Sequence, residues 1–267
     1  MSVLLLVFYV ICVVLGVWIL VDCIVHRRKI DAYLKYGAVF CLGVVVIQAG
    51  VLYLSGLPRE SGPRVAVFIL ALFPLLEILV ATCVGMDSCA VMGSIDAPLL
   101  KRLFRRHGEA DRLSPLPYAV WTINTAIAAT AFSLVLFWLT SPQLSALLKA
   151  WVAKTGAGTE PTLLTAVVCT RHAFFEEIVF RLGIQSFLAR QFRLQGRKYW
   201  IAIVLTSALW AIGHAGTMDP EWVKLAQIFP IGIALGALFR KYGVESCILA
   251  HGIFNLVMLP YAPHLIR

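Results

Sequence analysis

Two adjacent acids stand in the segment RHAFFEEIVFRLG, residues 171–183, among residues that are mostly apolar. Glu177 and Arg181 are four residues apart, so on a helix they share a face and can form an ion pair. Glu176 is turned about 100° away by the 3.6-residue period, which leaves its carboxylate available to another partner. An ionisable group inside hydrocarbon costs at least about 2.5–3.5 kcal/mol and is tolerated where it faces protein or water. The pattern predicts one structural acid and one available acid.

Two further stretches supply polar pairs at the same spacing. Trp210 and His214 share a helix face in ALWAIGHAG, and His251 and Asn255 share one in HGIFN. Singly, such residues are typical of hydrogen bonds between membrane helices. Together with Glu176 they provide a carboxylate, two imidazoles and an amide, which are the groups that activate water and stabilise an oxyanion. The set predicts a hydrolytic site.

The order of these motifs, Glu-Glu-x-x-x-Arg, aromatic-x-x-x-His and His-x-x-x-Asn, resembles the CAAX prenyl endopeptidase and bacteriocin-processing family of intramembrane proteases, also called the CPBP or Abi family. The resemblance covers roughly residues 160–260, and Trp210 stands where Phe is commoner. It implies an endopeptidase that cleaves a membrane-associated protein or peptide near its membrane-associated, C-terminal end. Prenylated CAAX tails, bacteriocin-like peptides, pheromones and C-terminal sorting helices are all substrates of such relatives, and the sequence leaves the choice open.

Carried over by position, the resemblance implies roles for four residues. Glu176 would be the general base that activates water, and His214 would share or orient the proton. His251 and Asn255 would hydrogen-bond the oxyanion that develops on the scissile carbonyl.

Four more residues are expected to support that site. Glu177 and Arg181 would hold their helix in register. Trp210 precedes the second-motif histidine by one turn, and His172 lies one turn before the first acid, where it can line a water-filled cavity.

A metal is the open alternative to this chemistry. Glutamate and two histidines are acceptable zinc ligands. However, the chain has no HExxH pair, and the resemblance implies glutamate-dependent hydrolysis. We expect no cofactor, with catalytic zinc left open.

Composition defines the surroundings of these residues. The 267-residue chain is 60% hydrophobic and 14% charged, which is too apolar for a soluble domain of this size. We therefore predict an all-α fold, a polytopic membrane helical bundle of about eight transmembrane helices in the lipid bilayer. The net charge of +9 requires no nucleic acid, because the basic residues occupy short loops between apolar runs. Each run approaches the ~20 residues that cross the hydrocarbon core, and the runs are 2–25, 37–56, 65–93, 118–139, 162–185, 199–214, 222–240 and 244–260.

The basic loops predict the orientation of the bundle. With eight spans they all fall on one side, which is the cytoplasm by the positive-inside rule, so both termini are expected outside, in a bacterial inner membrane. The first run has no basic n-region before it and is expected to be a retained anchor. Between the third and fourth spans, residues 96–117 place Leu99, Leu100, Leu103 and Phe104 at helical spacing among basic residues, which predicts an amphipathic interfacial segment. The basic residues are Arg27, Arg28, Lys29, Lys35, Lys101, Arg102, Arg105, Arg106, Arg112, Arg190, Arg193, Arg197, Lys198, Arg240 and Lys241.

The motifs can meet only if the fifth helix is long. If it ended near residue 181, Glu176 and His214 would lie at different depths. We therefore predict a helix over 162–190, a short sixth helix, and irregular protein-lined backbone in HAGTMDPEW. Gly232 and Gly236 form a small-xxx-small step that predicts close approach of a neighbouring helix.

The rest of the chain adds few signals. Residues 1–117 carry no recognised motif and 118–267 hold the protease-like part, which is the predicted division. Glu77 is a further acid inside a span, for which we favour a polar partner on a neighbouring helix over a place in a substrate groove. The seven cysteines show no metal spacing and are expected to be small core residues. A transporter or proton-coupled channel, or a non-catalytic scaffold or immunity relative, are the alternative functions.

Overall fold

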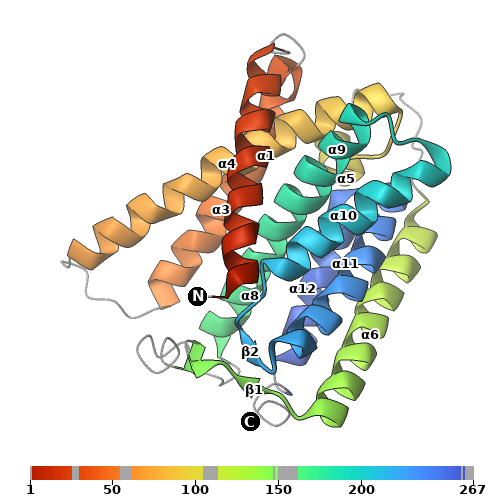
Figure 1. The fold of residues 1–267 in the computed structure, drawn as a ribbon. Coiled ribbons are helices and arrows are strands. Elements are labelled where there is room, and N and C mark those ends of the chain that lie inside the picture. Colours follow the sequence, from red (N-terminus) through yellow and green to blue (C-terminus); the bar gives the residue numbers. More distant parts are fainter. Residues whose placement is uncertain are drawn as a thin grey trace.

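The computed structural model confirms an all-α membrane bundle (Figure 1). Its helices are α1 (Val3–Val25), α3 (Leu34–Leu54), α4 (Gly62–Met92), α5 (Pro98–Leu103), α6 (Pro115–Thr140), α8 (Leu163–Glu176), α9 (Ser186–Gln191), α10 (Tyr199–Ile212), α11 (Glu221–Tyr242) and α12 (Val244–Met258). Between them lie the 3-10 turns η1 (Asp31–Tyr33) and η3 (Gly196–Lys198), the π-helix η2 (Glu177–Gln185), and two short strands, β1 (Gln143–Leu144) and β2 (Met218–Asp219). The structure describes residues 2–25, 30–54, 62–104, 114–146, 148–149, 162–259 and 261, with only the backbone for residue 52 and residues 62–73.

Among the described residues, five helical segments are long and apolar enough to cross a membrane, which supports an integral, multi-pass membrane protein. Helix α12 is apolar but shorter. Within the described residues, each of the eight predicted runs overlaps a helix. The five segments are Val3–Val25, Asp31–Val51, Pro74–Met92, Pro115–Thr140 and Glu221–Tyr242.

The predicted long fifth helix and short sixth helix are confirmed. Helices α8, η2 and α9 follow one another without a break from Leu163 to Gln191, whereas α10 has 14 residues. Glu176 consequently lies near the middle of a long helix, so the sequence conflict over depth disappears.

The loops sort to two ends of the bundle. Strands β1 and β2 pair antiparallel, Gln143 with Asp219 and Leu144 with Met218, and join the segments that follow α6 and α10. Figure 1 shows this pair and the start of α1 at one end, and α5 and the end of α9 at the other. Helix is confirmed for Pro98–Leu103 of the predicted interfacial segment. Its residues 105–113, with Arg105, Arg106 and Arg112, lie outside the described residues, as do Arg27, Arg28 and Lys29.

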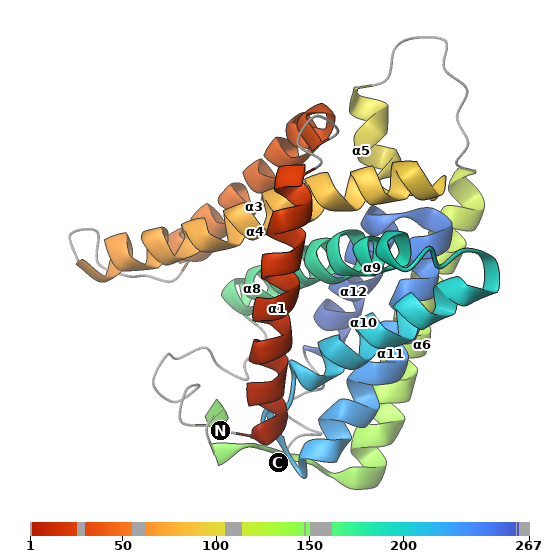
Figure 2. The ribbon, with the colours of Figure 1, turned by 45° about the horizontal axis from the view of Figure 1, so that its top comes forward.

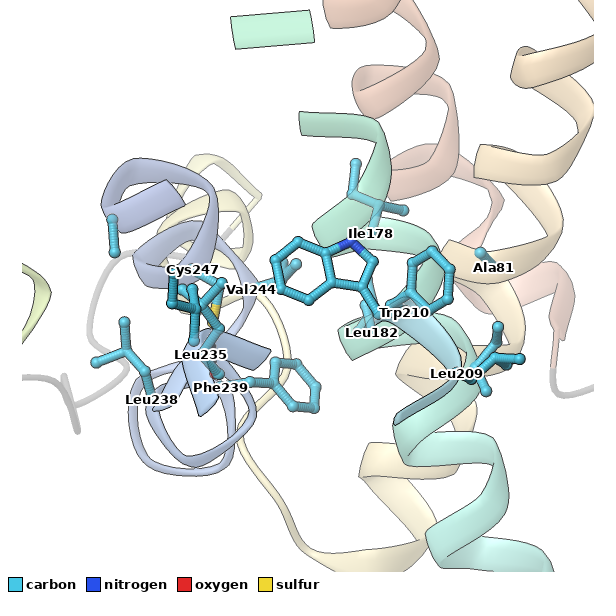
Figure 3. Packing of buried hydrophobic residues seen from close by; sticks show 14 of the residues in the cluster. Ala81, Ile178, Leu182, Leu209, Trp210, Leu235, Leu238, Phe239, Val244 and Cys247 are labelled. Atoms are coloured by element: carbon cyan, nitrogen blue, oxygen red, sulfur yellow. Dashed lines mark hydrogen bonds between the residues drawn. The ribbon is translucent and has the colours of Figure 1, made fainter. Parts of the chain in front are cut away.

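Helix packing centres on η2 and α10. Figure 3 shows the Trp210 indole between Ile178 and Leu182 of η2 on one side and Leu235 and Cys247 on the other. Because lipid is as apolar as these side chains, close van der Waals packing holds such helices together. All seven cysteines are free, as expected for small core residues.

Glycines allow two close contacts between helices. A Cβ on Gly232 would lie 2.9 Å from the Ser207 Cβ and 3.1 Å from the Trp210 Cε3, so the predicted close contact of α11 is made with α10. A Cβ on Gly85 of α4 would overlap the carbonyl oxygen of Leu182, so α4 lies directly on the π-helix.

Ion pairs and a hydrogen bond connect the N-terminal helices to this core. Arg190 of α9 donates from Nη1 to Asp87 Oδ2 at 2.6 Å and from Nη2 to Asp22, and Gln191 Nε2 donates to Asp22 Oδ1 at 2.9 Å. This cluster links α1, α4 and α9. Elsewhere α3 and the first half of α4 extend away from α10, α11 and α12 (Figures 1 and 2). The division at residue 117 remains a prediction, although residues from both sides share one core cluster.

Candidate active site

The two acids lie where the fifth helix changes its winding. Glu176 is the last residue of α8, and η2 begins at Glu177. π-Helical turns are rare in proteins, and those that occur are often found at functional sites. Along η2, Glu177, Arg181 and Gln185 follow at four-residue steps, and all three are fully buried. The winding therefore turns one row of polar side chains into the protein.

Glu177 is the structural acid of the pair. Its Oε2 accepts from Arg181 Nε at 3.2 Å, which confirms the ion pair that the spacing predicts. Its Oε1 is 2.9 Å from Nδ1 of His251 on α12, a contact that the spacing could not predict. The Arg181 guanidinium also lies 5.0 Å from the centroid of the Trp210 ring. Glu177 thus connects the first and third motifs.

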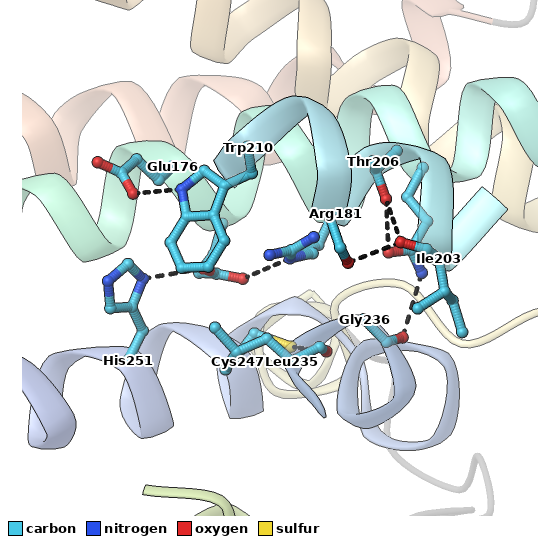
Figure 4. A network of polar contacts seen from close by, with 12 residues as sticks. Glu176, Arg181, Ile203, Thr206, Trp210, Leu235, Gly236, Cys247 and His251 are labelled. Atoms are coloured by element: carbon cyan, nitrogen blue, oxygen red, sulfur yellow. Dashed lines mark hydrogen bonds and ion pairs between the residues drawn. The ribbon is translucent and has the colours of Figure 1, made fainter. Parts of the chain in front are cut away.

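Glu176 is held through its carboxylate oxygen Oε2. Its Oε2 accepts a hydrogen bond from Trp210 Nε1 at 2.7 Å. The other oxygen accepts no hydrogen bond from any residue that the structure describes, and the side chain is only half-buried. Its charge interacts with His214, His251 and His172. Figure 4 shows the Glu176 carboxylate and the His251 imidazole at the same end of the polar network.

The hydrogen bonds assign a proton to one nitrogen of each imidazole. His214 Nδ1 is 2.9 Å from the Trp210 carbonyl oxygen, which can only accept, so we assign the proton to Nδ1. His251 Nδ1 faces the Glu177 carboxylate and is assigned a proton for the same reason. In each neutral ring Nε2 is then an acceptor. A neutral His251 cannot donate to an oxyanion, so the role that the resemblance implies for it requires the imidazolium.

Two predicted residues lie beside this network. Asn255 is half-buried and donates from Nδ2 to the Cys169 carbonyl oxygen of α8 at 3.3 Å, two turns before Glu176. His172 is exposed, and its charge interacts with that of Glu176. The structure therefore joins six of the eight predicted residues through hydrogen bonds and ring contacts, and places Asn255 and His172 next to them. The six are Glu176, Glu177, Arg181, Trp210, His214 and His251.

Sequence reasoning missed a second polar chain on α11. Lys224 Nζ donates to Gln227 Oε1 at 2.9 Å, and Gln227 Nε2 donates to Ser133 Oγ of α6 at 3.0 Å. The charge of Lys224 interacts with that of Glu176. The available signal was a lysine and a glutamine three residues apart, just before the apolar middle of the helix.

The described part of the chain was also compared with what a metal site requires. Among those residues, no three His, Cys, Asp or Glu side chains converge as a metal site would require.

The polar partner that the sequence favours for Glu77 is not seen among the described residues and stays a prediction. The Glu77 carboxylate accepts no hydrogen bond from them and lines a groove of about 530 Å³ between α1, α4 and the fifth helix. The groove is otherwise largely apolar. It reaches the site region through Phe175, beside Glu176, and Phe8, whose ring a Cβ on Gly213 would meet at 2.9 Å.

Comparison with known proteins confirms the family resemblance over the motif-bearing region. Residues 158–257 match the family described as type II CAAX prenyl endopeptidase Rce1-like. The sporulation-killing factor biosynthesis protein SkfC of Bacillus subtilis (strain 168) is 42% identical over 60 residues, an alignment that covers 22% of this chain and 12% of that relative. No solved structure matches. The matches support a membrane-embedded protease and leave its substrate and its reacting residues undetermined.

Proposed function

We propose that this protein is an intramembrane endopeptidase that hydrolyses a peptide bond near the membrane-associated, C-terminal end of its substrate, with water activated by Glu176. The observation that carries the proposal is the state of Glu176. One carboxylate oxygen is held by Trp210 Nε1 at 2.7 Å, the other has no partner among the described residues, and two imidazoles lie beside it. A fixed carboxylate with one open oxygen is what a general base requires.

In the proposed reaction the water molecule donates one hydrogen bond to the open oxygen of Glu176 and a second hydrogen bond to Nε2 of His214. Its oxygen attacks the scissile carbonyl carbon, and Glu176 takes the first proton, so the negative charge moves from the carboxylate to the carbonyl oxygen. Asn255 has a second N–H available to that oxyanion besides the one that bonds Cys169. Glu176 then returns the proton to the leaving nitrogen as the C–N bond breaks.

Glu177 would act through His251. Its contact with His251 Nδ1 at 2.9 Å orients the ring, as a buried carboxylate does for a catalytic histidine. The imidazolium would donate from Nε2 to the oxyanion. Arg181 offsets part of the Glu177 charge, which keeps the pair compatible with a buried position.

The test is cleavage by purified protein in detergent. Two reporters cover the substrate classes of the family, an S-farnesylated CAAX peptide and a bacteriocin-type precursor peptide. Any further substrate would come from membranes in which Glu176→Gln protein traps its targets for mass spectrometry. We expect Glu176→Gln, His214→Ala and His251→Ala each to reduce cleavage by about 10²–10⁴-fold while the protein remains folded.

Asp31→Asn is the control, because Asp31 is an exposed acid in η1, outside both the proposed machinery and the groove. It should cleave at the rate of the unmodified protein. Addition of 1,10-phenanthroline should leave the rate unchanged if no metal takes part. Unreduced cleavage by Glu176→Gln would refute Glu176 as the base, and loss of cleavage with the chelator would favour zinc.

We also propose the orientation that the basic loops predict. Lys101, Arg190 and Arg240 belong to the helix ends opposite β1 and β2, which supports a cytoplasmic face at those ends, both termini outside, and a bacterial inner membrane as the location.

A further inference from the structure

A cation faces the candidate active site from α11. Lys224 lies in the first turn of this helix and is partly buried. Its Nζ donates to Gln227 Oε1 at 2.9 Å, and Gln227, which is 2% exposed, donates in turn to Ser133 Oγ at 3.0 Å. Ser133 is fully buried on α6. A buried amide and hydroxyl therefore fix the position of the ammonium group.

The packing of α10 against α11 brings this ammonium to the level of His214. Gly232 of α11 packs on Ser207 and Trp210 of α10. The two helices are joined by one short connection and run in opposite directions. Lys224 is about two turns before Gly232, and His214 is about one turn after Trp210, so both lie toward the same end. The charge of Lys224 interacts with the Glu176 carboxylate and also with the His214 ring.

This ammonium has no direct counter-ion in the described part of the chain. No carboxylate oxygen there lies within 4.0 Å of Lys224 Nζ, and its hydrogen-bond partner is a neutral amide. Glu221 is one turn earlier on α11 but is not paired with it. A lysine ammonium carries three donors, so two remain for another group. A partly buried ammonium group costs free energy unless an anion is paired with it.

We propose that Lys224 binds the free C-terminal carboxylate of the peptide substrate. This inference rests on the proposed function and deepens it. With the carboxylate on Lys224 and the scissile carbonyl at Glu176, the cleaved bond lies a short distance from the end of the substrate chain. Lys224 is then the residue that makes the enzyme select a chain end, and the same chemistry could also hold the phosphate of a lipid.

Binding tests this without requiring cleavage. The Glu176→Gln protein in detergent is titrated with an S-farnesylated tetrapeptide of Cys, Val, Val and Ser that ends in a free carboxylate, and with the same peptide as its carboxamide. The readout is the dissociation constant from thermophoresis. We expect the carboxylate to bind about tenfold to a hundredfold more tightly than the amide, as for a hydrogen bond to a charged group.

Variants at Lys224 separate this role from others. Lys224→Met should abolish the preference for the carboxylate, and Lys224→Arg should retain most of it because the charge is kept. Lys241→Met is the matched control, since Lys241 is an exposed lysine at the other end of α11, beside the Trp121 ring, and it should leave the preference unchanged. Circular dichroism verifies that each variant is folded.

Three outcomes would overturn the inference. These are equal affinity for carboxylate and amide, no binding of either peptide, or a preference that survives Lys224→Met. Competition by phosphatidylglycerol in place of a carboxylate preference would assign the site to lipid phosphate instead. Each result is independent of the Glu176 cleavage series. Wild-type cleavage without a carboxylate preference would refute only the role of Lys224, and a carboxylate preference without cleavage would refute only the proposed reaction.

Discussion

The buried ion pair between Glu177 and Arg181 allows a quantitative test of how charge is balanced beneath the candidate site. Both side chains are fully buried. Glu177 has a second partner, His251, whereas Nη1 and Nη2 of Arg181 have no hydrogen-bond partner among the described residues. The guanidinium also lies 5.0 Å from the centroid of the Trp210 ring. Removal of the acid should therefore cost more than removal of the base.

The magnitudes follow from this asymmetry. Glu177→Gln leaves Arg181 as an uncompensated buried cation, which should lower the free energy of unfolding by about 3–5 kcal/mol. Arg181→Met leaves a carboxylate whose Oε1 still accepts the hydrogen bond from His251 Nδ1, so we expect a loss of about 1–3 kcal/mol. The double variant replaces the pair by neutral groups, and such replacement is often close to neutral. With a near-neutral double variant, the two single losses should be non-additive by about 4 kcal/mol or more.

Unfolding by sodium dodecyl sulfate in mixed micelles, followed by circular dichroism, measures these differences. Two results would refute the reasoning. Additive losses in the double variant would show that the two charges do not interact, and a larger loss for Arg181→Met than for Glu177→Gln would show that His251 does not compensate Glu177.

Two other substitutions test single contacts. Trp210→Phe keeps a ring against Arg181 and His251 but removes the Nε1 donor to Glu176, so cleavage of the reporters should fall about tenfold to a hundredfold. Trp222→Phe, at an exposed tryptophan, should not change the rate, and an unchanged rate in Trp210→Phe would show that this donor does not position the carboxylate. Gly85→Ala places a Cβ against the Leu182 carbonyl oxygen of the π-helix and should destabilise the protein by about 1–3 kcal/mol. Gly16→Ala, where a Cβ would meet nothing within 4 Å, should not, and equal stabilities would mean that α4 can move away from η2 at little cost.

The sequence by itself determined the helices and the pairing of residues within each helix. Apolar runs of membrane-spanning length predict helices because an unpaired backbone group in hydrocarbon is too costly. The ion pair of Glu177 with Arg181 follows from a spacing of four along one helix. The long fifth helix followed from a requirement of depth, since Glu176 and His214 could not otherwise meet. These conclusions depend on local geometry or on length, and both can be read along the chain.

Only the tertiary structure decided which residues of different helices face one another. His251 lies against Glu177, the Trp210 indole holds Glu176, and Lys224 enters from α11, although no spacing along the chain connects these residues. Arg190 joins Asp22 and Asp87 in the same way, across helices that are far apart in sequence. The π-helical winding at η2 and the close approaches at Gly85 and Gly232 set the rotation and the distance of neighbouring helices. A helical period gives the face on which a side chain lies, but the partner on that face depends on packing angles and on a change of winding that no local pattern encodes.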